Sequence, residues 1–367
     1  MLTRWPGGRK GRSARPPASP SQEAWSQLPP PTTPSPTAGD AVPPPPADPT
    51  PVRGAADRFV LAEGPRLLPA VGCLVGGGPD ADPDVSRRFI AATSRQGIDL
   101  RHLWAETGPD GRPIRAVLVV PNPGRTAVFF AGPAAGPADA VGLAGLIEHV
   151  AGRLDTGDIH LAQALVDPGD TSLSAAFLGG GFTRLADLGY LERPIPARPL
   201  PATPWPDGVR TTPSDDSRRS EVIDVLLASY EDTMDCPGLR GLRDPEDVFE
   251  GHRLAGAFEP ALWRILECDG RAAGVIMINP SPGSGTVELI YLGLAAEARG
   301  RGLGRRLLVD ALNALRNRSE PTISLAVDLA NTPALGLYRS LGFRSRCRRV
   351  AFIRSLVRGV GDRPDAE

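Results

Sequence analysis

The chain has 367 residues, with 41 Lys and Arg against 42 Asp and Glu and a formal net charge of −1. A charge this balanced provides no overall field that would attract nucleic acid or an anionic membrane. No apolar run reaches the ~18 residues of a membrane helix, and the basic N-terminus lacks the apolar segment of a secretory signal. We therefore expect neither nucleic acid nor membrane as a partner.

Cysteine and histidine spacing predicts no metal site. The four cysteines form no Cys-x-x-Cys pair and fit no zinc pattern, and the four histidines are isolated from one another in sequence. Reduced cysteines are typical of a reducing compartment, so we expect a cytoplasmic protein.

The first 56 residues are rich in Pro, Ser, Ala and Thr. Such a segment buries too little apolar surface to offset the entropy lost on ordering. We expect residues 1–56 to be a disordered tail. Whether they belong to the mature protein stays open, because a start codon placed too far upstream would give the same composition.

Residues 57–193 are predicted to alternate between strands and helices. β-Branched content and alternation predict strands, and longer amphipathic runs predict helices. In chain order the prediction is strands at 98–106, 114–120 and 126–131, a helix at 138–153, a strand at 159–166, a helix at 171–178 and a strand at 185–191. Proline punctuation then predicts a linker over 194–207.

A second ordered region is expected over 208–356, followed by a short tail over 357–367. Asp244 is a predicted N-cap, and Asp269-Gly270 predicts the turn of a hairpin. The predicted helices lie at 217–230, 245–253 and 303–315, and the predicted strands at 262–268, 271–278, 287–294, 322–327 and within 344–354.

A glycine-rich basic loop, Arg299-Gly300-Arg301-Gly302-Leu303-Gly304, joins the strand at 287–294 to the helix at 303–315. Glycine lets backbone N–H groups approach a ligand with no Cβ in the way. The first helical turn adds unpaired N–H groups and a partial positive charge, and arginine adds fork-shaped donors for phosphate oxygens. The loop therefore predicts a diphosphate site, although the dinucleotide-binding and P-loop spacings are both absent.

A second motif follows the strand at 322–327 and reads Asn331-Thr-Pro-Ala-Leu-Gly-Leu-Tyr338-Arg-Ser-Leu-Gly342-Phe343. Asn331 is a predicted N-cap, and Gly342 is a predicted helix stop. The spacing places Tyr338 on the apolar face of this helix, so its phenol is expected to point inward.

Both motifs resemble signatures of the GNAT family of N-acetyltransferases. The loop matches Arg/Gln-x-x-Gly-x-Gly/Ala, the second motif matches Asn-x-x-Ala-x-x-Leu-Tyr-x-x-x-Gly-Phe, and the resemblance spans roughly 208–355. It implies an α+β fold in which a mostly antiparallel mixed sheet is flanked by helices. It also implies acetyl-coenzyme A as cosubstrate, no metal, and a small-molecule or peptide amine as acceptor.

The resemblance also implies the site residues. Tyr338 matches the family's general acid toward the coenzyme A thiolate, and a phenol suits this role because its ordinary pKa is about 10. Glu288 lies where several members, including the tandem mycothiol synthases, carry a general base; a solvated or salt-bridged glutamate is the open alternative. Tyr230, Asp235 and His252 fall where the family lines the acceptor site. Coenzyme binding is implied for Leu292, Gly293, Leu294, Arg299, Gly300, Arg301, Gly302, Leu303, Gly304, Arg305, Asn331 and Tyr338.

The first half has the same order of elements as the second. Asp170 and Asn331 each lie eleven residues before a glycine, Gly181 and Gly342, and each of these glycines is followed by phenylalanine. The first half carries Gly-Pro-Ala-Ala-Gly-Pro in place of the basic loop, so two prolines remove N–H donors and no arginine is present. This pattern predicts a tandem duplication whose first copy has lost its coenzyme loop.

We therefore expect two acyl-CoA N-acyltransferase-like domains, a degenerate one over 57–193 and a catalytic one over 208–356. A tandem repeat can mimic a dimer within one chain, so a monomer is one possibility and the oligomeric state stays open. The predicted function is acetyl transfer from acetyl-coenzyme A to a primary amine that the sequence does not identify. A mycothiol synthase-like enzyme and a non-catalytic coenzyme A-binding sensor or scaffold are the alternatives.

Overall fold

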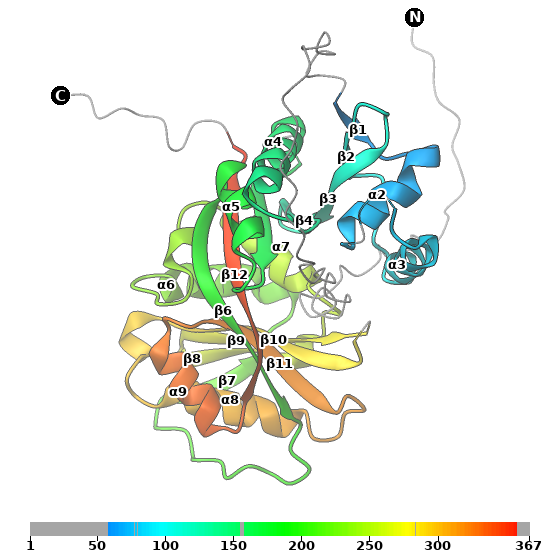
Figure 1. Cartoon of the computed structure of the whole chain (residues 1–367). Coiled ribbons are helices and arrows are strands. Elements are labelled where there is room, and N and C mark those ends of the chain that lie inside the picture. Colours follow the sequence, from blue (N-terminus) through cyan, green and yellow to red (C-terminus); the bar gives the residue numbers. More distant parts are fainter. Residues whose placement is uncertain (1–57, 77, 79, 155–157, 283, 358–367) are drawn as a thin grey trace, which may run out of the picture.

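A computed structural model of the chain describes residues 58–357 except 77, 79, 155–157 and 283 (Figure 1). The tail predicted over 1–56, and all but one residue of the tail predicted over 357–367, lie outside the described residues. Within the described ranges, none of the helices combines the length and apolar character that a bilayer crossing requires.

Twelve strands form one continuous sheet in the order β1-β2-β3-β4-β5-β12-β6-β11-β10-β9-β8-β7. They are β1 (Phe59–Leu61), β2 (Leu103–Thr107), β3 (Pro113–Asn122), β4 (Thr126–Ala131), β5 (Leu161–Val166), β6 (Thr183–Pro194), β7 (Val209–Pro213), β8 (Trp263–Cys268), β9 (Arg271–Ser281), β10 (Thr286–Leu294), β11 (Thr322–Asp328) and β12 (Arg344–Ser355). The described α-helices are α2 (Leu67–Leu74), α3 (Pro83–Arg95), α4 (Pro137–Arg153), α5 (Thr171–Gly179), α6 (Arg219–Ser229), α7 (Pro245–Leu254), α8 (Leu303–Ala314) and α9 (Thr332–Ser340). This is the predicted mixed sheet flanked by helices.

The strand order is symmetric about its centre. In the described part of the chain only two neighbouring pairs are parallel, β4 with β5 in the first half and β10 with β11 in the second. Asp170 and Asn331 both cap a helix through the side chain, and Gly181 and Gly342 have φ of 80° and 86°. The duplication predicted from sequence is thus visible in both topology and local geometry.

The two halves exchange their last strands. β6 belongs to the first half in sequence but pairs with β11, where Leu191 lies opposite Leu325. β12 belongs to the second half but pairs with β5, where Phe352 lies opposite Ala164. The two exchanged strands also pair with each other, and they run side by side through the middle of the molecule (Figure 1).

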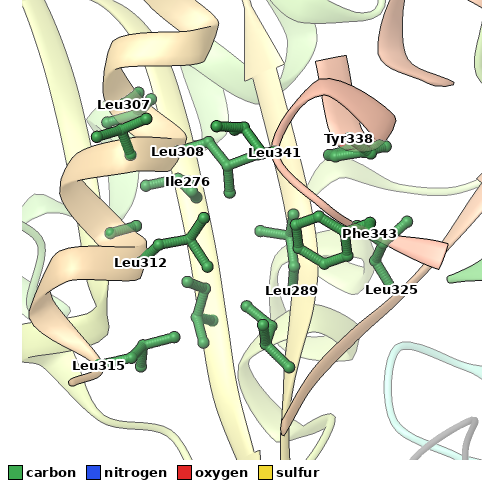
Figure 2. Packing of buried hydrophobic residues seen from close by; sticks show 14 of the residues in the cluster. Ile276, Leu289, Leu307, Leu308, Leu312, Leu315, Leu325, Tyr338, Leu341 and Phe343 are labelled. Atoms are coloured by element: carbon green, nitrogen blue, oxygen red, sulfur yellow. The ribbon is translucent and has the colours of Figure 1, made fainter. Parts of the chain in front are cut away.

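Helices cover both faces of the sheet in the second half. Because successive strand residues face opposite sides, Ile276 packs into the cluster with α8 and α9, whereas Val275 packs into the cluster with α6 and α7. Figure 2 shows the first cluster, in which Leu308 and Leu312 of α8 face the sheet beside Phe343. Burying each such leucine contributes about 1.5–3 kcal/mol.

Sequence reasoning missed the elements before β2. β1, α2 and α3 were not predicted, although Asp82 and Pro83 carry a helix-start signal: the Asp82 side chain accepts a hydrogen bond from Asp84 N. The strand predicted over 98–106 was wrong in its first part. Ile98 N donates to Thr93 O and completes the end of α3, so β2 begins only at Leu103.

Candidate active site

A cavity opens where β10 and β11 separate. The parallel pairing is limited to Val287 with Ile323 and Glu288 with Ser324. A register shift in β10 between Leu289 and Tyr291 lies at the same level. Beyond this point the strands enclose a cavity of about 230 Å³, which β10, β11, α9, Arg299 and the loop after α6 line. A gap between strands of one sheet provides room for an extended ligand and leaves strand N–H and C=O groups free to bind it.

The glycine-rich loop has the conformation that a phosphate cradle needs. Gly300 and Gly302 have φ of 71° and 73°, and a Cβ built at either position would have no atom within 4 Å. Gly302 is the N-cap of α8 and provides no side-chain cap, so the first N–H groups of the helix are left without an intrahelical acceptor. The backbone around these glycines is therefore open to an anionic ligand, and it fits a diphosphate.

The arginines of this loop lie in different environments. Arg299 lines the cavity, but its Nε donates to Leu294 O at 3.0 Å and an Nη donates to Ser229 O at 2.9 Å. Arg305 donates to Ser340 Oγ at 2.7 Å. Arg301 is exposed, and within the described residues its side chain has no hydrogen-bond or ion-pair partner. Arg299 thus holds the loop to the protein, while Arg301 is available to solvent anions.

Two residues of the second motif face the cavity. Asn331 Oδ1 accepts a hydrogen bond from Ala334 N at 3.2 Å, so this side chain caps α9 while it lines the cavity. Tyr338 is only 7% exposed, and its ring packs edge-on against Phe343. Among the described residues its hydroxyl has no hydrogen-bond partner. Burial raises the pKa of Tyr338, with the charge of Asp235 as a second cause, so the phenol keeps its proton at neutral pH.

Glu288 lies at the closed end of the strand gap. It is 7% exposed, its Cα partners are Asn279 and Ser324, and it is not among the residues that line the cavity. Its charge acts on Tyr190 of β6, whose pKa is raised first by burial and then by Glu288. The first half of the chain therefore contributes a buried phenol that senses the charge of this carboxylate.

The three residues expected near an acceptor divide into two groups. Asp235 lines the cavity. Tyr230 and His252 do not; their rings pack against Tyr291 at 5.9 and 5.4 Å between centroids. Burial raises the pKa of Tyr230 to about 12 and lowers the pKa of His252 to about 3, so both are neutral at pH 7. These two residues support the wall of the cavity from behind.

Sequence reasoning missed how the loop after α6 is attached. Asp235 Oδ1 accepts from Asp328 N at 2.9 Å, and Asp328 Oδ2 accepts from Cys236 N at 3.2 Å. Asp328 directly follows the predicted strand at 322–327, and a carboxylate at that point was the available signal. This reciprocal pair fixes the loop to the end of β11.

Comparisons with known proteins agree with this geometry. A family model described as acetyltransferase (GNAT) family matches residues 226–343. A mycothiol acetyltransferase of Thermomonospora curvata is 35% identical over 178 residues, which is 48% of this chain and 58% of the relative. A mycothiol acetyltransferase of Thermobispora bispora is 33% identical over 201 residues, or 53% and 65% of the two chains. The chain thus spans less than two thirds of the length of these relatives.

One solved structure matches this chain over almost the whole length of the solved protein. The crystal structure of a GCN5-related N-acetyltransferase from Sphaerobacter thermophilus has a TM-score of 0.55 and 19% identity. The match covers 83% of this chain and 98% of that one, so it includes both halves of the sheet. At this identity the likeness establishes the fold.

Proposed function

We propose that this chain, a member of the GNAT family by the match over residues 226–343, transfers an acetyl group from acetyl-coenzyme A to a primary amine. The observation that carries the proposal is Tyr338, a buried phenol whose hydroxyl lacks a partner among the described residues and borders the cavity between β10 and β11. A proton donor held unpaired beside a strand gap is suited to a ligand that fills the gap.

The residues that would hold the coenzyme come from the glycine-rich loop, the end of β10 and the start of α9. The N–H groups of Gly300, Gly302 and the first turn of α8, together with Arg301, would bind the diphosphate. The strand edge at 292–294 and Asn331 would bind the pantetheine arm, and Arg299 would hold the loop in place. When bound, acetyl-coenzyme A supplies an activated thioester whose sulfur leaves as a thiolate.

Tyr338 is proposed as the general acid that protonates this thiolate. Burial keeps the phenol protonated at neutral pH, so its proton is present to be donated as negative charge develops on the departing sulfur. Two carboxylates are candidates for the proton that the amine must lose. Glu288 is buried at the closed end of the gap, whereas Asp235 borders the cavity directly.

A second candidate is narrower and is favoured by the relatives. Two similar proteins are named mycothiol acetyltransferase, and this name motivates a mycothiol synthase-like reaction on a small-molecule amine. We also propose the domain division from the sequence, 57–193 and 208–356, with the second as the catalytic part. The exchange of β6 and β12 means that each part would complete its sheet with a strand of the other.

The test is release of coenzyme A thiol, followed by reaction with a chromogenic disulfide, for the full chain with acetyl-coenzyme A. The acceptor panel covers the chemical classes left open: glucosamine, cadaverine, alanyl-alanine and Nα-acetyl-lysine. Amine-dependent thiol release would support the enzyme. Coenzyme A binding without release across the panel would instead support a sensor or scaffold.

A further inference from the structure

One carboxylate oxygen of the cavity has no donor. Asp235 Oδ1 accepts from Asp328 N at 2.9 Å, which orients the side chain, and Oδ2 has no hydrogen-bond partner among the described residues. Asp328 is 5% exposed, and its own oxygens accept from Cys236 N and Ala330 N. Asp235 therefore lines the cavity with one oxygen bound by Asp328 N and the other without a partner among the described residues.

The unpaired Tyr338 hydroxyl is an independent sign that a ligand binds at the same place. Tyr338 is more than nine-tenths buried and lines the same cavity as Asp235. The two groups are close enough that the charge of Asp235 contributes to the raised pKa of the phenol. A proton donor and a carboxylate thus line the same cavity, and Glu288 is not among the residues that line it.

The charged residues that line the cavity suit a cation. Asp232 and Asp235 are its acidic lining residues, and the basic lining residue, Arg299, donates to the carbonyl oxygens of Leu294 and Ser229. A carboxylate with a free oxygen makes short, charge-assisted hydrogen bonds to an ammonium group. An anionic acceptor would bring like charge against this oxygen, and a neutral N–H donor would make a weaker hydrogen bond to it than an ammonium group.

We propose that Asp235 receives the ammonium group of the acceptor and takes its proton, so that the acceptor is a primary amine that binds as a cation. This inference rests on the proposed function. The proton moves from the ammonium nitrogen to Asp235 and leaves a free lone pair. That pair forms the C–N bond to the thioester carbon, the C–S bond breaks toward sulfur, and Tyr338 protonates the thiolate. The second nitrogen proton returns to the Tyr338 oxygen, and the Asp235 proton is released to solvent, which yields amide, thiol and one proton.

The groups around Asp235 favour this proton transfer. Asp328 on β11 acts on it with a like charge. The phenols that sense the charge of Asp235 are neutral at pH 7 and come from the end of α6, from β10 and from α9: Tyr230, Tyr291 and Tyr338. Asp235 is partly open to solvent, yet burial raises the pKa of its carboxyl; the hydrogen bond from Asp328 N lowers this pKa, and the charge of the Asp328 carboxylate raises it. A raised pKa makes a carboxylate a better proton acceptor.

The test compares Asp235→Asn with Glu231→Gln in the full chain. Asparagine keeps the oxygen that accepts from Asp328 N and removes the charge, whereas Glu231 is an exposed neighbour that does not line the cavity. For each amine of the panel that is turned over, Asp235→Asn should lower kcat/KM by about 10²-fold at pH 7, in the range expected for a general base. The kcat/KM of Asp235→Asn should rise about tenfold per pH unit in the pH range where kcat/KM of the unaltered protein no longer changes, because solvent then removes the proton. The coenzyme A Kd should stay within about twofold, and Glu231→Gln should match the unaltered protein.

Three results would overturn the inference. The first is an unchanged kcat/KM in Asp235→Asn, and the second is a loss of kcat/KM in this variant that is the same at every pH. The third is that the fall of kcat/KM at low pH disappears in Glu288→Gln and persists in Asp235→Asn. A separate measurement covers failure of the proposed function itself. If the unaltered protein releases no thiol with any amine, calorimetry of cadaverine in the presence of coenzyme A decides. If the unaltered protein binds cadaverine and Asp235→Asn does not, the cation site is supported. If both proteins bind cadaverine equally, or neither binds it, the cation site is refuted.

Discussion

Replacing Gly302 by Asp or Asn separates the charge of the phosphate cradle from its shape. Gly302 has φ of 73° and ψ of 7°, and its Cβ position is empty to 4 Å. Asn and Asp are the side chains that tolerate this left-handed conformation best, and they differ mainly in charge. Both variants should therefore fold, at a cost of about 1–2 kcal/mol relative to glycine.

The Asp variant should be the more stable of the two, and the Asn variant should bind coenzyme A more tightly. A carboxylate at the N-terminus of α8 interacts favourably with the helix dipole, so Asp should be more stable than Asn by about 0.3–1 kcal/mol. The same carboxylate would repel the diphosphate. With one unit charge at about 5 Å and an effective dielectric constant of about 20, the repulsion is roughly 3 kcal/mol, or about 150-fold in Kd.

Calorimetric titration with coenzyme A measures this difference, and urea unfolding measures the stability. The Asn variant should bind within about tenfold of the unaltered protein, and the gap between Asp and Asn should narrow at high salt because the charges are screened. Equal coenzyme A affinity for Asp and Asn would show that no phosphate approaches Gly302 and would refute the cradle.

Three further predictions concern single side chains. Tyr338→Phe should lower kcat by about 10²-fold with an unchanged coenzyme A Kd, because only the proton donor is lost; an unaltered rate at saturating amine would leave Tyr338 with a packing role. Gly293→Ala should destabilise the fold by about 1–3 kcal/mol in urea unfolding, since its Cβ would lie 2.5 Å from the Tyr291 ring and 2.7 Å from Ser229 Oγ; full stability would contradict the tight approach. Asp235→Asn should raise Tm more at pH 7.5 than at pH 4. A carboxyl whose pKa is raised on folding stabilises the fold at pH values below its ordinary pKa near 4, and this contribution is lost as the pH rises through the raised pKa. A difference in Tm that does not change with pH would contradict the raised pKa.

Local signals in the sequence predicted many of the elements that build the site. The capping residues Asp244 and Asn331 begin α7 and α9 as expected, and Gly342 has the predicted positive φ. These features depend on residues within one turn of each other, so a single sequence contains them.

Features set by tertiary packing were not predictable in this way. Arg299 was predicted to bind the coenzyme because arginine suits phosphate oxygens, but its guanidinium donates to the carbonyl oxygens of Leu294 and Ser229. The bond between Asp235 and Asp328 N joins residues 93 positions apart, and no spacing rule connects them. The exchange of β6 and β12 was missed because strand pairing depends on which edges are free after each half has collapsed.

The exchange of final strands has a consequence for synthesis of the protein. β5 pairs with β12, so Phe352 must find Ala164, a partner that left the ribosome long before it. Until residues 344–355 emerge, a first-half sheet built from β1 to β5 ends in an open edge, and β6 has only the second half beside which to settle. Open edges of this kind invite pairing with other nascent chains. Completion of the fold should therefore wait for residues 344–355, because this strand pairs with both β5 and β6.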